Sequence, residues 1–317
     1  MRKLFHLFVG LAVLILLMPF GTAKATQAVV YVSDTGSGTA CTRAAPCTFE
    51  QGMSALQSGD VLLSCINPVQ PNPAVSYLFQ TAGSFTLDCP STVWTTPQNT
   101  TTFSLQSTGL TFTIRNMTFD GASTGQNAII VTSGATLILE NCIFQDFNAG
   151  TGFPILFNPN GPGTLIIKDS VFQNNGLSGG VGGGISIQPN GGSARVVIER
   201  TQIVKNTSGI VANGSSGLVL AEIKDSTVAN NTVDGILAVT GGSTTSIVLN
   251  RSSVDHNGGS GAVAQGSGAY ISLSDSTVAW NANGLITTSG GLILSYQNNL
   301  IGGNPNPGVT PVSVSRQ

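Results

Sequence analysis

The segment AEIKDSTVANN (221–231) recurs from residue 110 onward with its pattern of apolar and polar positions preserved. Further copies include LILENCIFQDF (137–147), LIIKDSVFQNN (165–175) and ISLSDSTVAWN (271–281). When all copies are aligned, the position of Asp225 serves as an anchor, and the anchors are Asn116, Asn141, Asp169, Arg200, Asp225, Arg251, Asp275 and Tyr296, at steps of 21 to 31 residues. A repeat of this length predicts a solenoid with one structural coil per copy.

Each copy carries apolar residues two and four positions before the anchor, such as Ile223 and Ala221, and every copy except the degenerate last one also carries an apolar residue three positions after it, such as Val228. This alternation predicts a strand with one buried face, followed around a corner by a second strand. A third apolar segment, such as GILA (235–238), separates neighbouring copies. We therefore predict an all-β fold, a parallel β-helix with three short strands per coil and about ten coils. A leucine-rich repeat is disfavoured because its signature is missing, and a β-sandwich would not keep three apolar columns in register.

One column of asparagines lies six positions after the anchor: Asn175, Asn206, Asn231, Asn257 and Asn281. In a β-helix, equivalent residues stack about 4.8 Å apart along the axis. Stacked asparagines can hydrogen-bond from coil to coil and tolerate the left-handed backbone of a corner. We interpret this column as a structural ladder.

Two columns of charged residues alternate in sign. The column before the anchor reads Arg115, Glu140, Lys168, Glu199 and Lys224, and the anchor column reads Asp169, Arg200, Asp225, Arg251 and Asp275. Alternation favours register between similar coils, since like charges would repel. A catalytic arginine beside carboxylates is the alternative, and the ladder accounts for the same residues better. Cys142 stands in a column of mostly Ser and Thr, which favours a small inward-facing residue over a nucleophile.

The first 25 residues have the pattern of a signal peptide. Arg2 and Lys3 precede an apolar run (4–20), and Ala23-Lys24-Ala25 follows as a cleavage-site pattern. An uncleaved anchor is the alternative, but the run is short for a spanning helix, and no later segment is long or apolar enough to span. We expect a secreted or periplasmic protein that begins near Thr26.

Residues 26–317 are predicted to form one domain: an N-terminal cap (26–65), the coils (66–303) and a loose C-terminal cover (304–317). Within the cap, 48–60 reads as a short helix with a capping box between Thr48 and Gln51 and an end at Gly59. Four of the five cysteines cluster near this end, so we expect disulfides Cys41–Cys47 and Cys65–Cys89, although other connectivities are possible.

Charge and composition exclude several kinds of partner. Loss of residues 1–25 would leave 9 Lys and Arg against 14 Asp and Glu, which disfavours nucleic acid and anionic membranes. With only His6 and His256 in the chain and no C-x-x-C pair, a zinc site is not expected. We predict no metal and no cofactor.

The chain resembles the bacterial right-handed parallel β-helix repeat proteins of the pectin-lyase-like superfamily. The resemblance rests on YVSDTGSGTACTRAAPCTFEQGMSAL (31–56), GDVLLSC (59–65), the KDSTVANN-type units and LSYQNNLIGGN (294–304), and covers nearly all of 26–317. It implies a right-handed coil. It leaves the activity open, because the superfamily includes lyases, hydrolases and adhesive proteins.

Two catalytic chemistries known from the superfamily can be tested against the residues. Pectate-lyase-like members hold Ca²⁺ with clustered Asp residues, whereas the third strands here read AIIV, PILF, GIVA, GILA and GAVA, without a carboxylate. Glycosidases need two carboxylates, for which Asp120 and Asp146 on adjacent coils are the candidates; an exposed pair in a turn is the alternative.

A binding surface is better supported by the columns four and five positions after the anchor. They form a polar stripe that contains Gln145, Gln173, Lys205, Asp255, His256 and Trp280, next to the two aspartates. An aromatic ring beside planar polar groups is typical of saccharide sites, and an ordinary solvated face is the alternative. The leading hypothesis is a non-catalytic protein that binds polysaccharide or cell-surface glycan; the others are a polysaccharide lyase or hydrolase and a structural or adhesive spacer.

Overall fold

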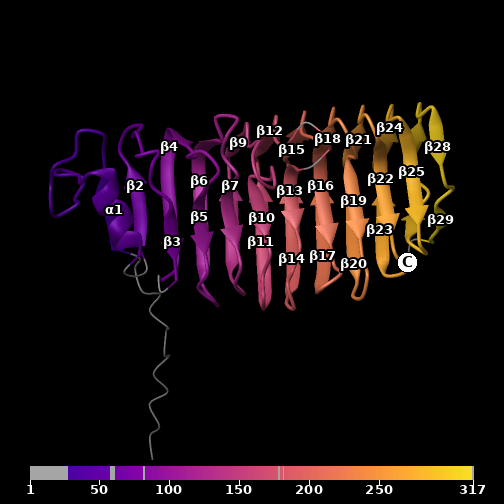
Figure 1. Cartoon of the computed structure of the whole chain (residues 1–317), viewed down its shortest axis with the longest axis horizontal. Coiled ribbons are helices and arrows are strands. Elements are labelled where there is room, and N and C mark those ends of the chain that lie inside the picture. The colour runs from indigo at the N-terminus through magenta and orange to yellow at the C-terminus, as the bar shows by residue number, and fades with distance from the viewer. Residues whose placement is uncertain (1–27, 58–60, 81–82, 178, 181, 316–317) are drawn as a thin grey trace, which may run out of the picture.

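The chain forms one elongated parallel β-helix with a short helix at its N-terminal end (Figure 1). The computed structural model describes residues 28–315 except 58–60, 81–82, 178 and 181. The expected signal peptide, 1–25, therefore lies outside the described residues. In the part of the chain that is described, no helix has the length and apolarity needed to cross a membrane.

One sheet contains one strand from each of ten successive coils, all paired in parallel. Its strands are β3 (Tyr77–Phe79), β5 (Thr101–Leu105), β7 (Asn127–Val131), β10 (Ile155–Phe157), β13 (Gly183–Ile187), β16 (Ser208–Asn213), β19 (Ile236–Val239), β22 (Ser260–Gln265), β25 (Asn283–Thr288) and β28 (Asn306–Gly308). The prediction of about ten coils is confirmed.

The other strands form a bent sheet with two rows, one on each side of the anchor column. The row before the anchor contains β1 (Ala28–Val32), β2 (Val61–Cys65), β4 (Phe85–Thr95), β6 (Thr111–Asp120), β8 (Thr136–Glu140), β11 (Pro162–Lys168), β14 (Ser193–Glu199), β17 (Leu218–Lys224), β20 (Thr245–Asn250), β23 (Ala269–Ser274), β26 (Leu292–Ser295) and β29 (Val312–Ser313). The row after it contains β9 (Ile143–Gln145), β12 (Val171–Gln173), β15 (Gln202–Val204), β18 (Thr227–Ala229), β21 (Ser253–Asp255), β24 (Thr277–Ala279) and β27 (Leu300–Gly302), while β4 and β6 run through both rows. Three strands per coil are thus confirmed.

The core is a set of stacked columns because equivalent residues of successive coils pair in register. The aromatic column after the anchor shows this: Phe119, Phe144 and Phe172 are fully buried, and their ring centroids lie 5.1 and 4.7 Å apart. Near the N-terminal end, buried Trp94 packs edge-on against Phe49 of the helix. Apolar burial of this kind contributes most of the stability of the fold.

The corners depend on single residues with left-handed backbone. The anchors from Asn116 to Asp275 have φ between 46° and 63°, and the residues five positions later, from Asp146 to Trp280, have φ between 53° and 59°. The expectation that the ladder asparagines themselves take this conformation is wrong, since the left-handed residue directly precedes each of them. That residue turns the chain so that the following asparagine side chain points inward.

The asparagine ladder itself is present, and it is longer than predicted. The Nδ2 group of each ladder residue donates to Oδ1 of the next, at 2.8 to 3.2 Å, from Asn175 through Asn281. Asn281 donates to Asn304, so the last rung comes from the segment that was predicted to be a loose cover. All these side chains are buried, and each Oδ1 also accepts a backbone N–H of the preceding coil.

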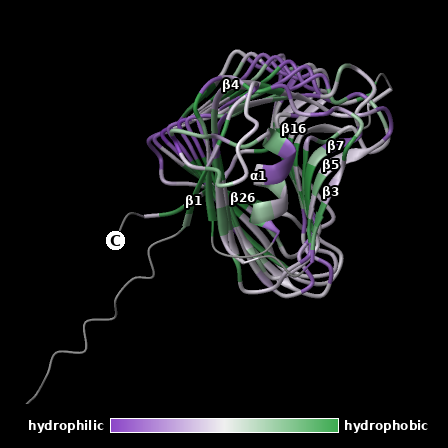
Figure 2. Ribbon diagram, turned by 90° about the vertical axis from the view of Figure 1, so that its left-hand side faces the viewer, coloured by the Kyte–Doolittle hydropathy of each residue, from purple (hydrophilic) through white to green (hydrophobic). Residues whose placement is uncertain are grey.

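The N-terminal end is closed by helix α1 (Phe49–Leu56), which lies across the open core between the two sheets (Figure 2). Thr48 and Gln51 form the predicted capping box. The helix ends at Leu56 with Gln57 as its C-cap, while the predicted stop, Gly59, lies outside the described residues.

Two disulfides join parts of this end, Cys41–Cys47 in the cap and Cys65–Cys89 between β2 and β4, as predicted. At the opposite end, β28 and β29 pair with β25 and β26, so residues 304–317 include a further partial coil. Pro307 stands within edge strand β28, where its missing N–H makes this edge a poor template for another strand.

Candidate functional site

The polar stripe predicted from the sequence follows one corner of the coil. Residues four positions after the anchor end the short strands of the second row, and residues five positions after it take the left-handed conformation and turn outward. The polar column four positions after the anchor is not continuous. Val204 and Ala229 separate Gln173 from Asp255, and Ala279 follows Asp255. The predicted residues consequently fall into two groups separated along the axis.

The first group is a hydrogen-bonded chain across three coils. Gln173 Nε2 donates to Gln145 Oε1 at 3.1 Å, and Gln145 Nε2 donates to Asp120 Oδ2 at 3.0 Å. Asp120 Oδ1 accepts the backbone N–H of Ala122 at 2.7 Å. These three side chains therefore satisfy one another's hydrogen bonds and form a second, shorter ladder. They consequently have fewer free donors for a ligand.

The two candidate catalytic carboxylates lie on adjacent coils at the start of this ladder. Burial raises the pKa of Asp146 above its usual range, the charge of Asp120 raises it further, and a hydrogen bond from Asn174 opposes the rise. A carboxyl group with a raised pKa beside a second carboxylate is an arrangement that acid catalysis uses.

The second group contains the aromatic residue of the predicted site. His256 Nδ1 lies 2.9 Å from Asp255 Oδ1, and the His256 ring stacks on Trp280 with centroids 6.4 Å apart. The indole also lies close to Gly303, where an added Cβ would come within 2.7 Å of the ring. Trp280 is 63% exposed, so most of the side chain is open to solvent although His256 and Gly303 lie next to the ring.

Lys205 lies between the two groups at an exposed left-handed corner position. None of the predicted binding residues lines the hollows described below. Their placement on one corner was predicted correctly from the repeat, while their binding role is a proposal.

Some of the alternating charges pair between coils, among them Glu199 with Lys224. Arg200 binds Asp169 through two hydrogen bonds of 2.7 and 2.9 Å, and Arg251 binds Asp225 through two of 2.8 Å. These bonds lower the pKa of both aspartates. The arginines are thereby committed to carboxylates of the preceding coil, which favours the structural role over catalysis.

Cys142 is a free thiol that is 1% exposed and faces the core. Burial raises its pKa to about 12, so the thiolate is disfavoured at neutral pH. The inward-facing role predicted from its column is supported by this position, and Ser170 in the same column donates to a backbone carbonyl in the same manner.

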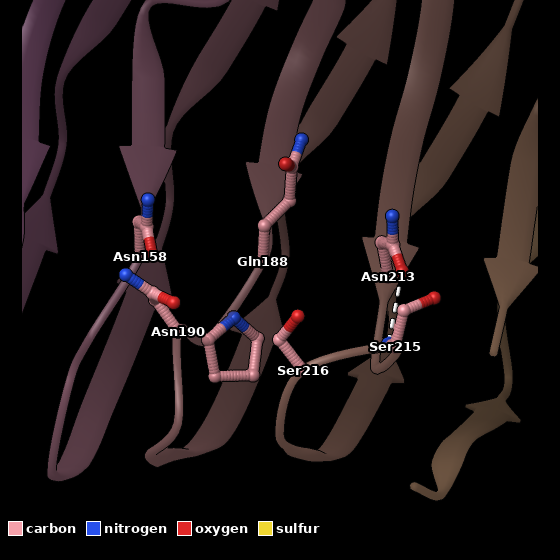
Figure 3. Close-up of a pocket in the computed structure, with 7 residues that line it drawn as sticks. Asn158, Gln188, Asn190, Asn213, Ser215 and Ser216 are labelled. Atoms are coloured by element: carbon pink, nitrogen blue, oxygen red, sulfur yellow. Dashed lines mark hydrogen bonds between the residues drawn. The ribbon is translucent and has the colours of Figure 1, made fainter. Parts of the chain in front are cut away.

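A groove that the sequence analysis did not single out lies at the ends of three neighbouring strands of the ten-stranded sheet. It has a volume of about 160 Å³ and is lined by Asn158, Gln188, Pro189, Asn190, Asn213, Ser215 and Ser216. Figure 3 shows the amides of Asn158, Gln188 and Asn213 side by side; Asn158 and Gln188 directly follow β10 and β13, and Asn213 is the last residue of β16. The sequence signal is a mostly polar column two positions after the outward residue of each strand, which has amides at Gln106, Asn158, Gln188, Asn213 and Gln265 and which the core-based alignment did not include.

The polar groups of this groove are only partly paired. Asn213 Oδ1 accepts the N–H of Ser215 at 3.0 Å, and Gln188 Nε2 donates to Ser186 Oγ at 2.6 Å. Asn158 Oδ1 is buried and has no hydrogen-bond partner. A buried acceptor without a partner costs about 1–3 kcal/mol, and such atoms need an explanation in native proteins.

Two more hollows lie elsewhere on the surface. One, of about 520 Å³, follows the same edge of the ten-stranded sheet and is lined by Thr240, Gly241, Gly242, Ser243, Thr244, Gly266, Ser267, Gly268 and Ser289. The other, of about 350 Å³, covers the outer face of β14, β17 and β20 between Arg195 and Glu222.

Within the described residues, no group of three or more His, Cys, Asp or Glu side chains comes together. The donors present therefore do not fit the calcium chemistry implied by the resemblance to pectate-lyase-like proteins.

Comparisons with known proteins agree with this architecture. Two solved structures are similar: the pectate lyase Pel9A, with 15% identity and a TM-score of 0.48 over 92% of this chain and 78% of that one, and the A-module of the Azotobacter vinelandii mannuronan C-5 epimerase AlgE4, with 15% identity and a TM-score of 0.47 over 90% and 100%. No curated protein matches the chain. Residues 102–278, more than half of the sequence, match the family described as right handed beta helix region. The chain belongs to this right-handed β-helix family.

Proposed function

We propose that this protein is an exported β-helix that binds polysaccharide without cleaving it. The observation that carries the proposal is the groove at the ends of β10, β13 and β16, where Asn158, Gln188 and Asn213 place three amides on successive coils. Each amide offers both a donor and an acceptor, which suits the hydroxyl groups of sugars.

Two features support binding over catalysis at this groove. Asn158 Oδ1 is buried without a partner although the residue lines the groove, and a turn of the amide toward a sugar hydroxyl would give it one. The lining contains no carboxylate, histidine or other group able to transfer a proton near neutral pH. The two disulfides are consistent with export, since such bonds persist in oxidising compartments.

A glycan array and affinity electrophoresis with the purified protein test the proposal. We expect retention by at least one polysaccharide, and at least tenfold weaker binding by the Asn158→Ala/Gln188→Ala variant, which loses several hydrogen bonds of about 1 kcal/mol each. The matched control is Gln106→Ala, because Gln106 stands in the same column but does not line the groove.

Trp280→Ala tests the corner stripe in the same assay. If binding depends on Trp280 and not on the amides, the binding site is the stripe predicted from the sequence. If the wild-type protein retains no glycan, the spacer hypothesis replaces the binding hypothesis.

A second candidate function, polysaccharide cleavage, is favoured by one observation, the raised pKa of Asp146 beside Asp120. Incubation with a panel of polysaccharides would then release reducing or unsaturated sugar, and Asp120→Asn and Asp146→Asn would each abolish the release. We expect no release, because Asp120 is engaged by Gln145 and Ala122 and neither carboxylate lines a hollow described above.

A further inference from the structure

The ten-stranded sheet carries no charged side chain in the residues that the structure describes. Asp, Glu, Lys, Arg and His are missing from all ten strands, and also from the turns that follow six of them, residues 158–161, 188–192, 214–217, 240–244, 266–268 and 289–291. The charges lie on other walls, for example Arg195 on β14 and Glu222 on β17. This face is therefore polar or aliphatic but electrically neutral.

The two hollows along the edge of this sheet are consecutive. The amide groove belongs to the turns after β10, β13 and β16, and the larger hollow belongs to the turns after β19, β22 and β25. These six strands are neighbours in the sheet, so the hollows follow one line parallel to the axis. The second hollow is lined only by Gly, Ser and Thr, which offer hydroxyl and backbone groups.

An aliphatic stripe runs beside this line on the same outer face. Equivalent outward positions of successive strands pair in register, and they are Ile130, Leu156, Ser186, Val211, Leu237, Val263 and Ile286. All but Ser186 are aliphatic; Ser186 and Val263 are buried, and the other five are partly exposed. An aliphatic surface beside hydrogen-bonding groups matches a pyranose ring, which has an apolar C–H face and a polar rim of hydroxyls.

We infer that the ligand of this edge is an uncharged polysaccharide in an extended conformation, bound across about six coils. The inference rests on the proposed function and specifies the substrate class of the same site. A polyuronate would bring a carboxylate with nearly every sugar to a face that offers neither a cationic side chain nor carboxylates to hold a bridging cation. Desolvation of those charges would be uncompensated.

The dimensions of the site favour a polymer over a free sugar. The amide groove, at about 160 Å³, is smaller than the roughly 300–1,000 Å³ of sites that enclose a whole small ligand, and the hollow of about 520 Å³ continues it along the axis, so the two form one elongated site. Coils repeat at about 4.8 Å, and a sugar unit in an extended chain advances by nearly the same distance. One unit can therefore meet equivalent side chains on each coil.

Calorimetric titration of the purified protein tests the inference. The probes are soluble gluco-, xylo- and manno-oligosaccharides of two, four and six units, and oligogalacturonates and oligomannuronates of the same lengths, each with calcium and with chelator. We expect one neutral series to bind with affinity that rises up to about six units and does not depend on calcium or salt, and uronates to bind at least tenfold more weakly. Tighter binding of a uronate series, or binding that needs calcium, would overturn the inference while leaving the proposed function intact.

Two substitutions of Gln188 separate the ligand classes further. For an uncharged ligand, Gln188→Glu and Gln188→Lys lower the affinity to a similar extent, and salt changes neither. For an anionic ligand, Gln188→Lys would raise the affinity and Gln188→Glu would lower it, both in a salt-dependent way. Absence of binding by all the oligosaccharides and by the parent polysaccharides would refute the proposed function itself. Circular dichroism of each variant serves as the control for folding.

Discussion

Asn257 Nδ2 donates a hydrogen bond to Asn281 Oδ1 at 2.8 Å, and the backbone N–H of Asn257 donates to the same oxygen at 3.0 Å. Asn257 Nδ2 also donates to the carbonyl of Val228, and its own oxygen accepts two bonds from Asn231. One side chain thus satisfies groups on several strands inside the core, where an unpaired polar group is costly.

Replacement of this rung should destabilise the solenoid. We expect Asn257→Ala to lower the free energy of unfolding by about 2–4 kcal/mol, because it leaves buried N–H and C=O groups without partners. Urea unfolding followed by circular dichroism measures the change. The exposed Asn160→Ala serves as control, and an equal loss in both variants would contradict a structural ladder.

The arginine–aspartate pairs predict a pH dependence. Hydrogen bonds from Arg251 hold the pKa of Asp225 below its usual range, so the pair adds stability above the unfolded pKa of about 3.9 and loses it as the pH falls through the lower folded value. The difference in thermal midpoint between wild type and Arg251→Gln should therefore be largest near pH 7 and shrink as the pH falls through the lowered folded pKa of Asp225.

The salt dependence of the thermal midpoint tests the same ion pair in a second way. Both side chains are substantially exposed, so 1 M sodium chloride should shrink the difference at pH 7. Arg43→Gln, a change in the exposed cap loop, is the control for general charge effects. A difference that does not respond to pH would show that Arg251 acts through packing alone.

Cys142 should be replaceable by serine. Its Sγ lies 3.4 Å from the carbonyl of Glu140, and Ser170 in the equivalent position donates to the carbonyl of Lys168 at 2.7 Å. Cys142→Ser is expected to shift the thermal midpoint by no more than a few degrees. Cys142→Leu should cost about 1–3 kcal/mol through overpacking. In the native protein the buried thiol should resist alkylation at pH 8 and react only after unfolding.

The Cys65–Cys89 disulfide should stabilise the N-terminal coils. It closes a loop of 24 residues between β2 and β4, for which loop entropy predicts about 3 kcal/mol. The Cys65→Ser/Cys89→Ser variant is expected to lose this amount in urea unfolding. The Cys41→Ser/Cys47→Ser variant should lose less, since its loop spans only 6 residues. The reverse order would argue against the entropic account.

The repeat allowed most of the fold to be predicted, as particular residues show. Ile223 and Val228 were placed inward because of their distance from Asp225, and both are fully buried. The anchor position was read only as charged or polar, whereas its left-handed backbone became visible in the structure. Asn304 was missed in part because Tyr296 as the last anchor is wrong by one residue. Ile293 pairs with Ile271, and Gln297 has the left-handed backbone of an anchor.

The candidate site was less predictable, for a physical reason. Gln145 and Gln173 look like free polar groups in the sequence, yet each bonds to a neighbour because coil spacing brings equivalent side chains into contact. Trp280 looks isolated in the sequence, yet its ring has His256 and Gly303 of the adjacent coils as neighbours. Asn158 and Gln188 lie outside the core columns, so no apolar pattern pointed to them.

The sequence by itself determined the period, the inward columns, the asparagine ladder and the disulfides, because burial imposes the same residue choice on every coil. Only the tertiary structure decided which polar groups pair with one another and which line a groove. The physical reason is that coils stack about 4.8 Å apart, which brings side chains some 25 positions apart in the chain into contact. The same stacking leaves a neutral, hydrogen-bonding edge along the ten-stranded sheet.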